Sequence, residues 1–142
     1  MTLRTAIILI MEDNPTDVMI MREALTSAQV RVDLHVAQNG VIGMDFLRRV
    51  GAHSQAPRPD LILLDLNMPR KDGHEVLAEI KADASLSSIP VVVLTTSNSK
   101  DDVVRAYGAH ANCFIRKPVD FVRFTELMKS IEHFWFSVVT LP

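Results

Sequence analysis

The chain has 142 residues, which at roughly 150 residues per domain predicts a single domain. Its 48% hydrophobic and 23% charged residues are typical of a globular protein and exclude a disordered or fibrous one. The formal charge of −2 is too balanced to indicate a surface for nucleic acid or membrane.

Compartment and membrane topology also follow from simple counts. The one cysteine, Cys113, excludes an internal disulfide and fits a reducing cytosol. No apolar run reaches the ~18 residues that a membrane span needs, and the first residues lack the pattern of a signal peptide. We therefore expect a cytoplasmic protein without a membrane partner.

The first half of the chain alternates strand and helix. In chain order it predicts strand 6–11, helix 17–29, strand 32–37, helix 41–48 and strand 61–64. The runs 6–11 and 61–64 are apolar without alternation, which is typical of strands buried on both faces of a parallel sheet. Residues 32–37 alternate polar with apolar and suit the edge of a sheet.

The second half continues the alternation with helix 76–84, strand 91–94, helix 99–108, strand 112–115 and helix 121–135. Ser99 and Asp102 predict a capping box at the start of the fourth helix. The last helix has the clearest apolar stripe, formed by Phe121, Phe124, Leu127, Met128, Ile131 and Trp135. Because strand and helix alternate five times, the sequence predicts an α/β fold, a single-domain (βα)5 doubly wound parallel sheet.

Polar side chains follow the predicted strands directly, at the carboxyl edge where ligands bind in an open α/β sheet. They are Glu12, Asp13, Asp65, Asn67, Thr95 and Lys117. Three carboxylates in one crevice repel each other, so they need raised pKa values or a bound cation. Since the ligands are oxygens, with no paired His or Cys nearby, they favour Mg²⁺ or Mn²⁺ over zinc or copper.

The same edge disfavours a phosphate-bearing cofactor such as FMN or NAD. The turn 11–15 after the first strand carries two acids and no glycine, although such cofactors need a Gly-rich or hydroxyl-rich turn. The sequence also lacks a G-x-x-x-x-G-K-[ST] segment. We therefore expect no nucleotide cofactor.

Four motifs stand behind these strands: Glu12-Asp13-Asn14, Asp65-Leu66-Asn67-Met68-Pro69-Arg70-Lys71-Asp72-Gly73, Thr95-Thr96 and Lys117-Pro118. In this order and spacing they resemble the receiver domain of two-component response regulators. The resemblance runs from about residue 6 to about residue 136 and implies a CheY-like, flavodoxin-like sheet of order 2-1-3-4-5. The receiver domain would span 1–142, with 137–142 as a C-terminal tail.

The resemblance implies the chemistry of the site. Asp65 matches the aspartate that accepts a phosphoryl group from a histidine kinase or a phosphotransfer protein. Thr95 and Lys117 match the hydroxyl and the lysine that contact this group. The metal ligands would be Glu12, Asp13, Asp65 and Asn67.

The resemblance also implies a switch formed by Thr95 and Phe114. The family often has Tyr where this chain has Phe114, so the hydrogen bond of a phenol is not available here. Asn67 and Ser97 occupy positions that tune the lifetime of the phosphorylated state in relatives. The Lys117–Pro118 peptide bond is predicted to be cis, which would aim the lysine into the crevice.

The tail 134–142 and the long loop before Asp60 resemble the single-domain response regulators that are paired with bacterial phytochromes. This implies a red-light-sensing kinase, a phytochrome, as partner and a homodimer formed through the last helix and the tail. The consecutive Phe134, Trp135 and Phe136 cannot all face the core, so they predict an apolar surface patch. About six residues follow the last helix, too few for a DNA-binding output domain.

Two other functions are weighed against a stand-alone response regulator that acts as a signalling protein and not as an enzyme. A Mg²⁺-dependent aspartyl-phosphate phosphohydrolase of the haloacid dehalogenase type needs an acid two residues after its nucleophile, where Asn67 stands and cannot donate a proton. A binding module with a vestigial site has no reason to keep Asp13, Asp65, Thr95 and Lys117 together.

Overall fold

The computed structural model describes residues 5–26, 31–97, 99–138 and 140–141. Five parallel strands form one sheet of order β2-β1-β3-β4-β5. The strands are β1 (Ala6–Met11), β2 (Val32–Ala37), β3 (Leu61–Leu64), β4 (Val91–Thr95) and β5 (Cys113–Arg116). The predicted (βα)5 sheet and its order 2-1-3-4-5 are confirmed. Only the last two strands differ from the predicted limits: β4 ends one residue later, and β5 begins and ends one residue later.

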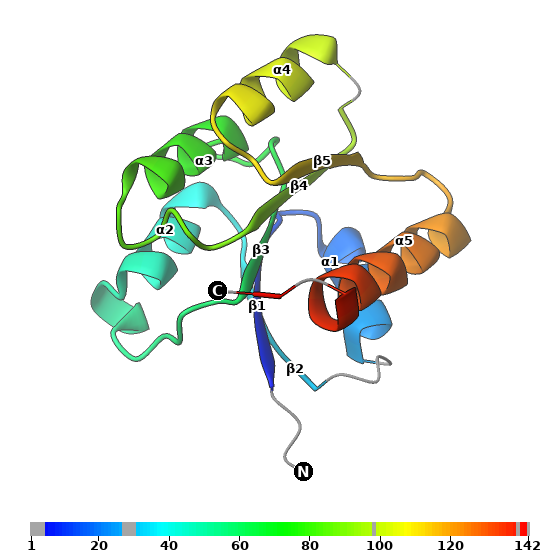
Figure 1. Ribbon diagram of the computed structural model, residues 1–142, viewed down its shortest axis with the longest axis horizontal. Coiled ribbons are helices and arrows are strands. Elements are labelled where there is room, and N and C mark those ends of the chain that lie inside the picture. Colours follow the sequence, from blue (N-terminus) through cyan, green and yellow to red (C-terminus); the bar gives the residue numbers. More distant parts are fainter. Residues whose placement is uncertain (1–4, 27–30, 98, 139, 142) are drawn as a thin grey trace.

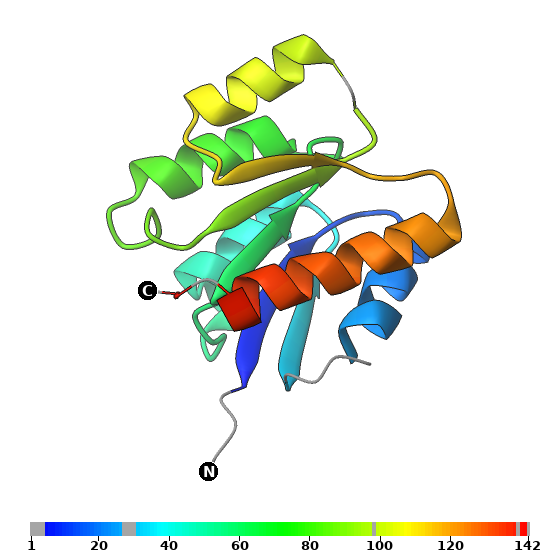
Figure 2. The same cartoon turned by 45° about the vertical axis from the view of Figure 1, so that its right-hand side comes forward.

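The helices cover both faces of this sheet. They are α1 (Pro15–Thr26), α2 (Gly40–Arg48), α3 (Gly73–Ala82), α4 (Lys100–Gly108) and α5 (Phe121–His133), with a 3-10 turn η1 (Gly51–His53) and a π-helical turn η2 (Phe134–Val138). Helices α1 and α5 lie side by side on one face, and α2, α3 and α4 lie on the other (Figures 1 and 2). No helix among the described residues is long and apolar enough to cross a membrane.

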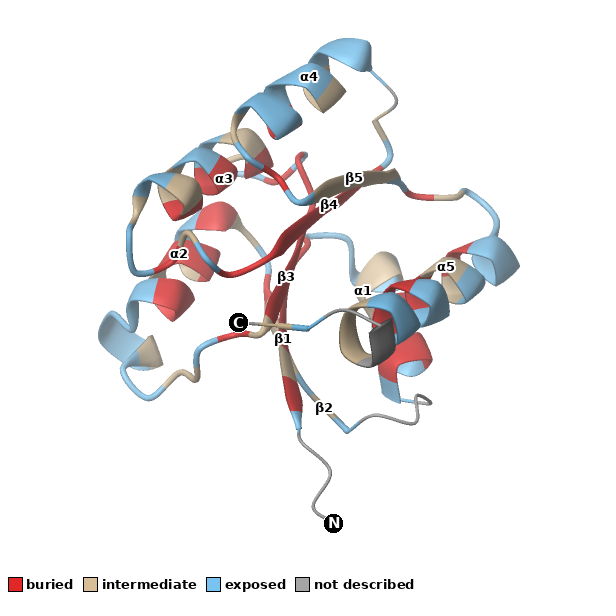
Figure 3. Ribbon diagram, viewed as in Figure 1, coloured by how far each residue is buried: buried red, intermediate tan, exposed pale blue. Residues whose placement is uncertain are grey.

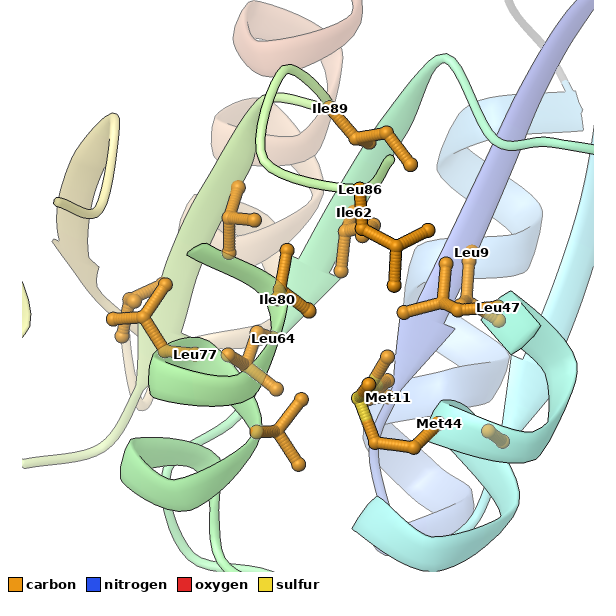
Figure 4. Close-up of a cluster of buried hydrophobic side chains, with 14 of the residues drawn as sticks. Leu9, Met11, Met44, Leu47, Ile62, Leu64, Leu77, Ile80, Leu86 and Ile89 are labelled. Atoms are coloured by element: carbon orange, nitrogen blue, oxygen red, sulfur yellow. The ribbon is translucent and has the colours of Figure 1, made fainter. Parts of the chain in front are cut away.

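The sheet separates two hydrophobic cores because successive residues of a strand point to opposite faces. In β3, Ile62 and Leu64 pack under α2 and α3 (Figure 4), whereas Leu61 and Leu63 pack under α1 and α5. All four are fully buried, as is most of the centre of the sheet (Figure 3). The unbroken apolar runs in the sequence follow from this double burial.

The helices begin at side chains that accept hydrogen bonds from the first free backbone N–H groups. Asn39, Asp72, Ser99 and Asp120 cap α2, α3, α4 and α5. A complete capping box occurs at Asp72 and Glu75, at the start of α3. The box predicted for α4 is only half formed, because the Asp102 carboxylate binds Ser97 and His74 instead.

Several predicted details differ in the structure, and the predicted helix 76–84 runs from Gly73 to Ala82. Phe121 is 55% exposed and not part of the core stripe, because it begins α5 at the rim of the sheet. No cis peptide bond occurs in the part of the chain that the structure describes, so the Lys117–Pro118 bond is not cis. The last helix ends at His133 and widens into η2.

Two predicted segments, the first helix and the C-terminal tail, extend beyond the residues that the structure describes. The predicted helix 17–29 starts earlier, at Pro15, and is described only to Thr26. In the C-terminal patch, Phe134 is half exposed, while Trp135 and Phe136 pack against the core beneath α1 and α5. The side chains of residues 137–139 lie outside the described part.

Candidate functional site

The sequence-predicted site residues meet at the carboxyl edge of the four strands β1, β3, β4 and β5. Backbone hydrogen bonds continue beyond the strand ends: Asp65 N donates to Met11 O at 3.1 Å, and Lys117 N donates to Thr95 O at 2.7 Å. These bonds hold Glu12, Asp65 and Lys117 in register across neighbouring strands. The predicted convergence of these side chains is therefore observed.

Three carboxylates form a compact cluster. One oxygen each from Glu12, Asp13 and Asp65 lies within 4.8 Å of the others. Glu12 and Asp65 are buried, whereas Asp13 is exposed and leaves the cluster open to solvent. A set of oxygens with one open side fits a small hard cation that keeps several waters, such as Mg²⁺.

The ammonium of Lys117 neutralises part of this negative charge. Its buried Nζ binds Glu12 and contacts Asp17 Oδ2 at 2.9 Å and Asp65 Oδ2 at 3.4 Å. The sequence analysis did not include Asp17 among the site residues. The available signal was its place in the first turn of the helix that leaves this edge.

Burial and charge shift two pKa values at the site. Burial raises the pKa of the Glu12 carboxyl to about 8, and the hydrogen bond from Lys117 offsets this only in part. Burial opposes the charge of Lys117, but Glu12, Asp65 and Asp17 outweigh it and raise its pKa above the ordinary value. One ammonium thus faces more negative charge than it can balance, which a divalent cation would relieve.

Thr95 and Asn67 are joined to each other by a hydrogen bond and lie next to Asp65. Thr95 is fully buried, and its Oγ1 accepts hydrogen bonds from Asn67 Nδ2 and from the backbone N of Ser97, both at 3.4 Å. The backbone N of Asn67 donates to Asp65 Oδ1 at 3.3 Å. The threonine hydroxyl is therefore engaged by its own loop in this conformation.

Phe114 lies on β5, the strand that pairs with the strand of Thr95. It is half-buried and packs against the core beneath α2 and α3. Its backbone N donates to the Tyr107 hydroxyl of α4 at 3.2 Å, so strand and helix are joined beside the aromatic ring. Phe114 therefore lies beside α4.

A hollow of about 350 Å³ opens beside Lys117, between the start of α1 and the loop that leads into α5. Asn14, Asp17 and Lys117 give it a polar floor, and Val119 and Phe121 form an exposed apolar rim. Through Lys117, this hollow adjoins the acidic cluster.

The order and spacing of these residues match a known protein family. The model of the response regulator receiver domain matches residues 8–131. The chain belongs to the receiver domain family of response regulators. The predicted family is thereby confirmed, and the phosphohydrolase alternative is not supported.

Within this family, the chain is similar to particular response regulators. Response regulator Rcp1 of Synechocystis sp. is 44% identical over 136 residues, which are 96% of this chain and 92% of the relative. The crystal structure of the phosphorylated cyanobacterial phytochrome response regulator RcpA has a TM-score of 0.96 at 45% identity, covering 98% of this chain and 99% of that one. This receiver domain is thus related to phytochrome response regulators.

The metal prediction is also supported. The Mn²⁺-bound form of Rcp1 is similar to this structure, with a TM-score of 0.94, 44% identity and coverage of 96% and 99% of the two chains. Receiver domains bind Mg²⁺ or Mn²⁺ at an acidic pocket, and Glu12, Asp13 and Asp65 form such a pocket here.

Proposed function

We propose that this chain is a stand-alone response regulator that accepts a phosphoryl group on Asp65 from a histidine kinase or a phosphotransfer protein. The observation that carries the proposal is the Asp65 carboxylate, buried at the end of β3 between two further acids and the Lys117 ammonium. A carboxylate in this setting is a nucleophile that already has one fixed positive charge beside it.

Each residue of the site has a distinct role in the proposed phosphoryl transfer. An Asp65 oxygen attacks the phosphorus of a phosphohistidine, the P–N bond breaks, and the released imidazole keeps the bonding electrons and takes up a proton from water. Glu12, Asp13, Asp65 and Asn67 would hold Mg²⁺, which would supply charge neutralisation for the transferred group. Lys117 pairs with one phosphoryl oxygen, and Thr95 donates its hydroxyl to another.

The switch follows from the product, which adds about −1.5 to −2 charge and three acceptor oxygens to a buried site. Thr95 turns toward these oxygens, and Phe114 moves into the space that it leaves. The change in charge thereby alters the surface formed by α4 and β5. The receiver acts on its own phosphoryl group alone and turns over no external substrate.

Incubation with acetyl phosphate and Mg²⁺ tests the acceptor. We expect one added phosphoryl group per chain by intact mass, and none for Asp65→Asn. The matched control Asp45→Asn removes a carboxylate from the middle of α2 and should label like the unmodified chain. Labelling that persists in Asp65→Asn, or steady turnover of a small phosphate ester, would contradict the proposal.

We further propose a phytochrome histidine kinase as the phosphoryl donor, and a cytoplasmic location. The likeness to RcpA and Rcp1 supports this partner, and the hollow beside Lys117 offers it a docking place next to Asp65. The formal charge of −2 argues against nucleic acid or membrane as a partner. Transfer from a phosphorylated phytochrome kinase should outpace transfer from an unrelated histidine kinase.

A homodimer through α5 and the tail is the proposed oligomer, within a receiver domain that spans 1–142 with 137–142 as its tail. The half-exposed ring of Phe134, packed edge-on against Trp135 at 5.6 Å, supports an apolar contact there. Phe134→Ser and removal of 137–142 should both weaken self-association in sedimentation. Val50→Ser, an equally exposed apolar residue after α2, should leave it unchanged.

A further inference from the structure

The carboxylate of Asp102, in the first turn of α4, joins three segments of the chain. Its Oδ2 accepts a hydrogen bond from Ser97 Oγ at 2.5 Å, and its Oδ1 lies 2.9 Å from Nε2 of His74 on α3. Ser97 belongs to the loop between β4 and α4. One carboxylate thus ties this loop to two helices.

The same loop holds the switch hydroxyl. The backbone N of Ser97 donates to Thr95 Oγ1 at 3.4 Å, while Ser97 Oγ accepts from the backbone N of Ser99 at 3.2 Å. Thr95 cannot turn toward a phosphoryl group on Asp65 and keep the Ser97 amide as its partner unless the loop moves with it. Movement of Ser97 in turn requires its hydroxyl to leave Asp102.

We propose that Ser97, Asp102 and His74 form a latch that holds the β4–α4 loop in the unphosphorylated conformation and opposes the turn of Thr95. His74 and Asp102 are positioning residues: they act through Ser97 and do not touch the phosphoryl group. This inference rests on the proposed role of Asp65 as the phosphoryl acceptor.

The latch is partly shielded from water, which distinguishes it from an ordinary surface pair. The side chain of His74 is 12% exposed and that of Asp102 is 27% exposed. Hydrogen bonds to an ionised group are short and stronger than neutral ones. The Ser97 hydroxyl and His74, with Arg105 one turn further along α4, hold the pKa of Asp102 below its ordinary value, so the carboxylate stays ionised at neutral pH.

Thermodynamic linkage converts these bonds into an effect on the switch. An interaction that exists only in the unphosphorylated conformation lowers the population of the switched conformation, and it lowers by the same factor the apparent affinity of the protein for ligands that bind the switched conformation. Its removal should therefore favour the switched state without any change at Asp65.

Beryllium fluoride with Mg²⁺, which mimics a phosphoryl group on an aspartate, is the probe. Asp102→Ala should bind it about three- to tenfold more tightly than the unmodified chain, as expected for the loss of one or two hydrogen bonds. The matched control Asp101→Ala removes an exposed acid from the same turn of α4 and should leave the affinity unchanged. Unchanged or weaker binding by Asp102→Ala would overturn the latch.

A double-mutant cycle separates the latch from a general loosening of α4. In a Ser97→Ala background, Asp102→Ala should add no further gain in affinity, because both variants break the same bond. Independent, additive gains would overturn the proposed coupling. His74→Ala should give a smaller gain by the same route.

Amide hydrogen exchange tests the latch without any phosphoryl analogue. Exchange at Ser97 and Ser99 should be faster in Asp102→Ala than in Asp101→Ala, and equal rates would refute the latch. Failure of the unmodified chain to bind beryllium fluoride would instead refute the role of Asp65, while the exchange rates would still decide whether the loop is latched.

Discussion

The burial of the Lys117 ammonium among carboxylates lowers the stability of the free protein. Taking an ammonium and two carboxylates out of water is expensive, and mutual attraction repays this only when each charge is paired. Here Glu12 and Asp65 share one lysine with Asp17, and burial pushes the pKa of Glu12 to about 8. One ammonium thus serves three carboxylates in the free protein, and a bound divalent cation would stabilise this arrangement.

Asp13 gives the sharpest test of the metal site. It is the exposed member of the acidic cluster, so Asp13→Asn leaves the buried contacts of Lys117 intact. We expect Mg²⁺ at a hundred times its dissociation constant to raise the free energy of unfolding of the unmodified chain by about 2.7 kcal/mol. Asp13→Asn should lose most of this gain, as measured by urea unfolding with and without Mg²⁺.

Asp101→Asn is the control for that measurement, because it removes an exposed acid from α4, far along the chain from the cluster. It should keep the full response to Mg²⁺. An equal response in Asp13→Asn would show that the cation binds elsewhere.

At the scale of elements, helix α3 packs against the loop that carries Asp65. The backbone N of Gly73 donates to Leu66 O at 2.9 Å at the start of this helix. A Cβ at Gly73 would lie 2.3 Å from Asp65 O and 2.6 Å from Leu66 Cα, closer than any side chain tolerates. The close approach of helix and loop therefore requires a glycine.

Gly73→Ala should push α3 away from the loop. We expect a loss of about 1–3 kcal/mol in the free energy of unfolding, typical of overpacking, together with slower labelling of Asp65 by acetyl phosphate. Gly108→Ala is the matched control, because no neighbouring atom lies within 4 Å of its added Cβ. This substitution should raise the free energy of unfolding by about 0.5–1 kcal/mol, since it lowers the entropy of the unfolded chain. Equal effects of the two substitutions would contradict the close packing at Gly73.

Glu79 on α3 pairs with Arg48 at the end of α2 and with Lys71 just before α3, and we expect this pairing to make stability depend on pH. Lys71 Nζ binds it at 2.5 Å and Arg48 at 3.5 Å, and the Lys71 hydrogen bond holds the pKa of Glu79 below its ordinary value of 4.5. A carboxyl with a lowered folded-state pKa adds stability above its unfolded pKa, and this stability is lost as the pH falls through the folded-state value.

Glu79→Gln should therefore lower the free energy of unfolding by about 0.5–1 kcal/mol at pH 7, the range of a partly exposed ion pair. The deficit should shrink as the pH falls below 4.5, which urea unfolding at a series of pH values would measure. Glu126→Gln on the exposed face of α5 should show no such pH-dependent deficit. A deficit for Glu79→Gln that stays constant into acid would argue against the ion pair.

The molecule as a whole is two cores divided by one sheet. Ile80 lies in the core beneath α2 and α3, and Ile131 lies in the core beneath α1 and α5. Both cores rest on the same buried strands, so neither layer is expected to unfold without the other. Perturbations in the two cores should remain independent because the sheet keeps their side chains apart.

Ile80→Val and Ile131→Val test this organisation. Each should lower the free energy of unfolding by about 0.5–1.5 kcal/mol, and the double variant should show the sum within about 0.5 kcal/mol in one cooperative urea transition. Two separate transitions, or a strongly non-additive double variant, would mean that the layers are not divided as described.

The local elements and the type of chemistry could be predicted from sequence because each depends on residues that are close along the chain. Unbroken apolar runs such as Ala6–Met11 indicate strands covered on both faces, and the polar residue directly after each run must lie at the carboxyl edge. Glu12, Asp65 and Lys117 were assigned to one crevice on this basis, and they do meet there. The resemblance to receiver domains supplied the strand order.

The partners of individual polar side chains could not be predicted in this way. Asp17 reaches Lys117 from 100 positions away, and Asp102 leaves its predicted capping role for Ser97 and His74. Phe121 fits the helical stripe yet stays at the surface, because its exposure depends on where α5 meets the sheet.

Sequence alone thus determined the elements, the sheet edge that carries the acids and the preference for a hard cation, since periodicity, chain order and ligand chemistry are local properties. Only the tertiary structure decided which carboxylates share Lys117, which glycine must stay small beside Asp65, and that Asp102 contacts both Ser97 and His74. These depend on distances of a few ångströms between segments that are far apart in the chain, and packing alone sets such distances.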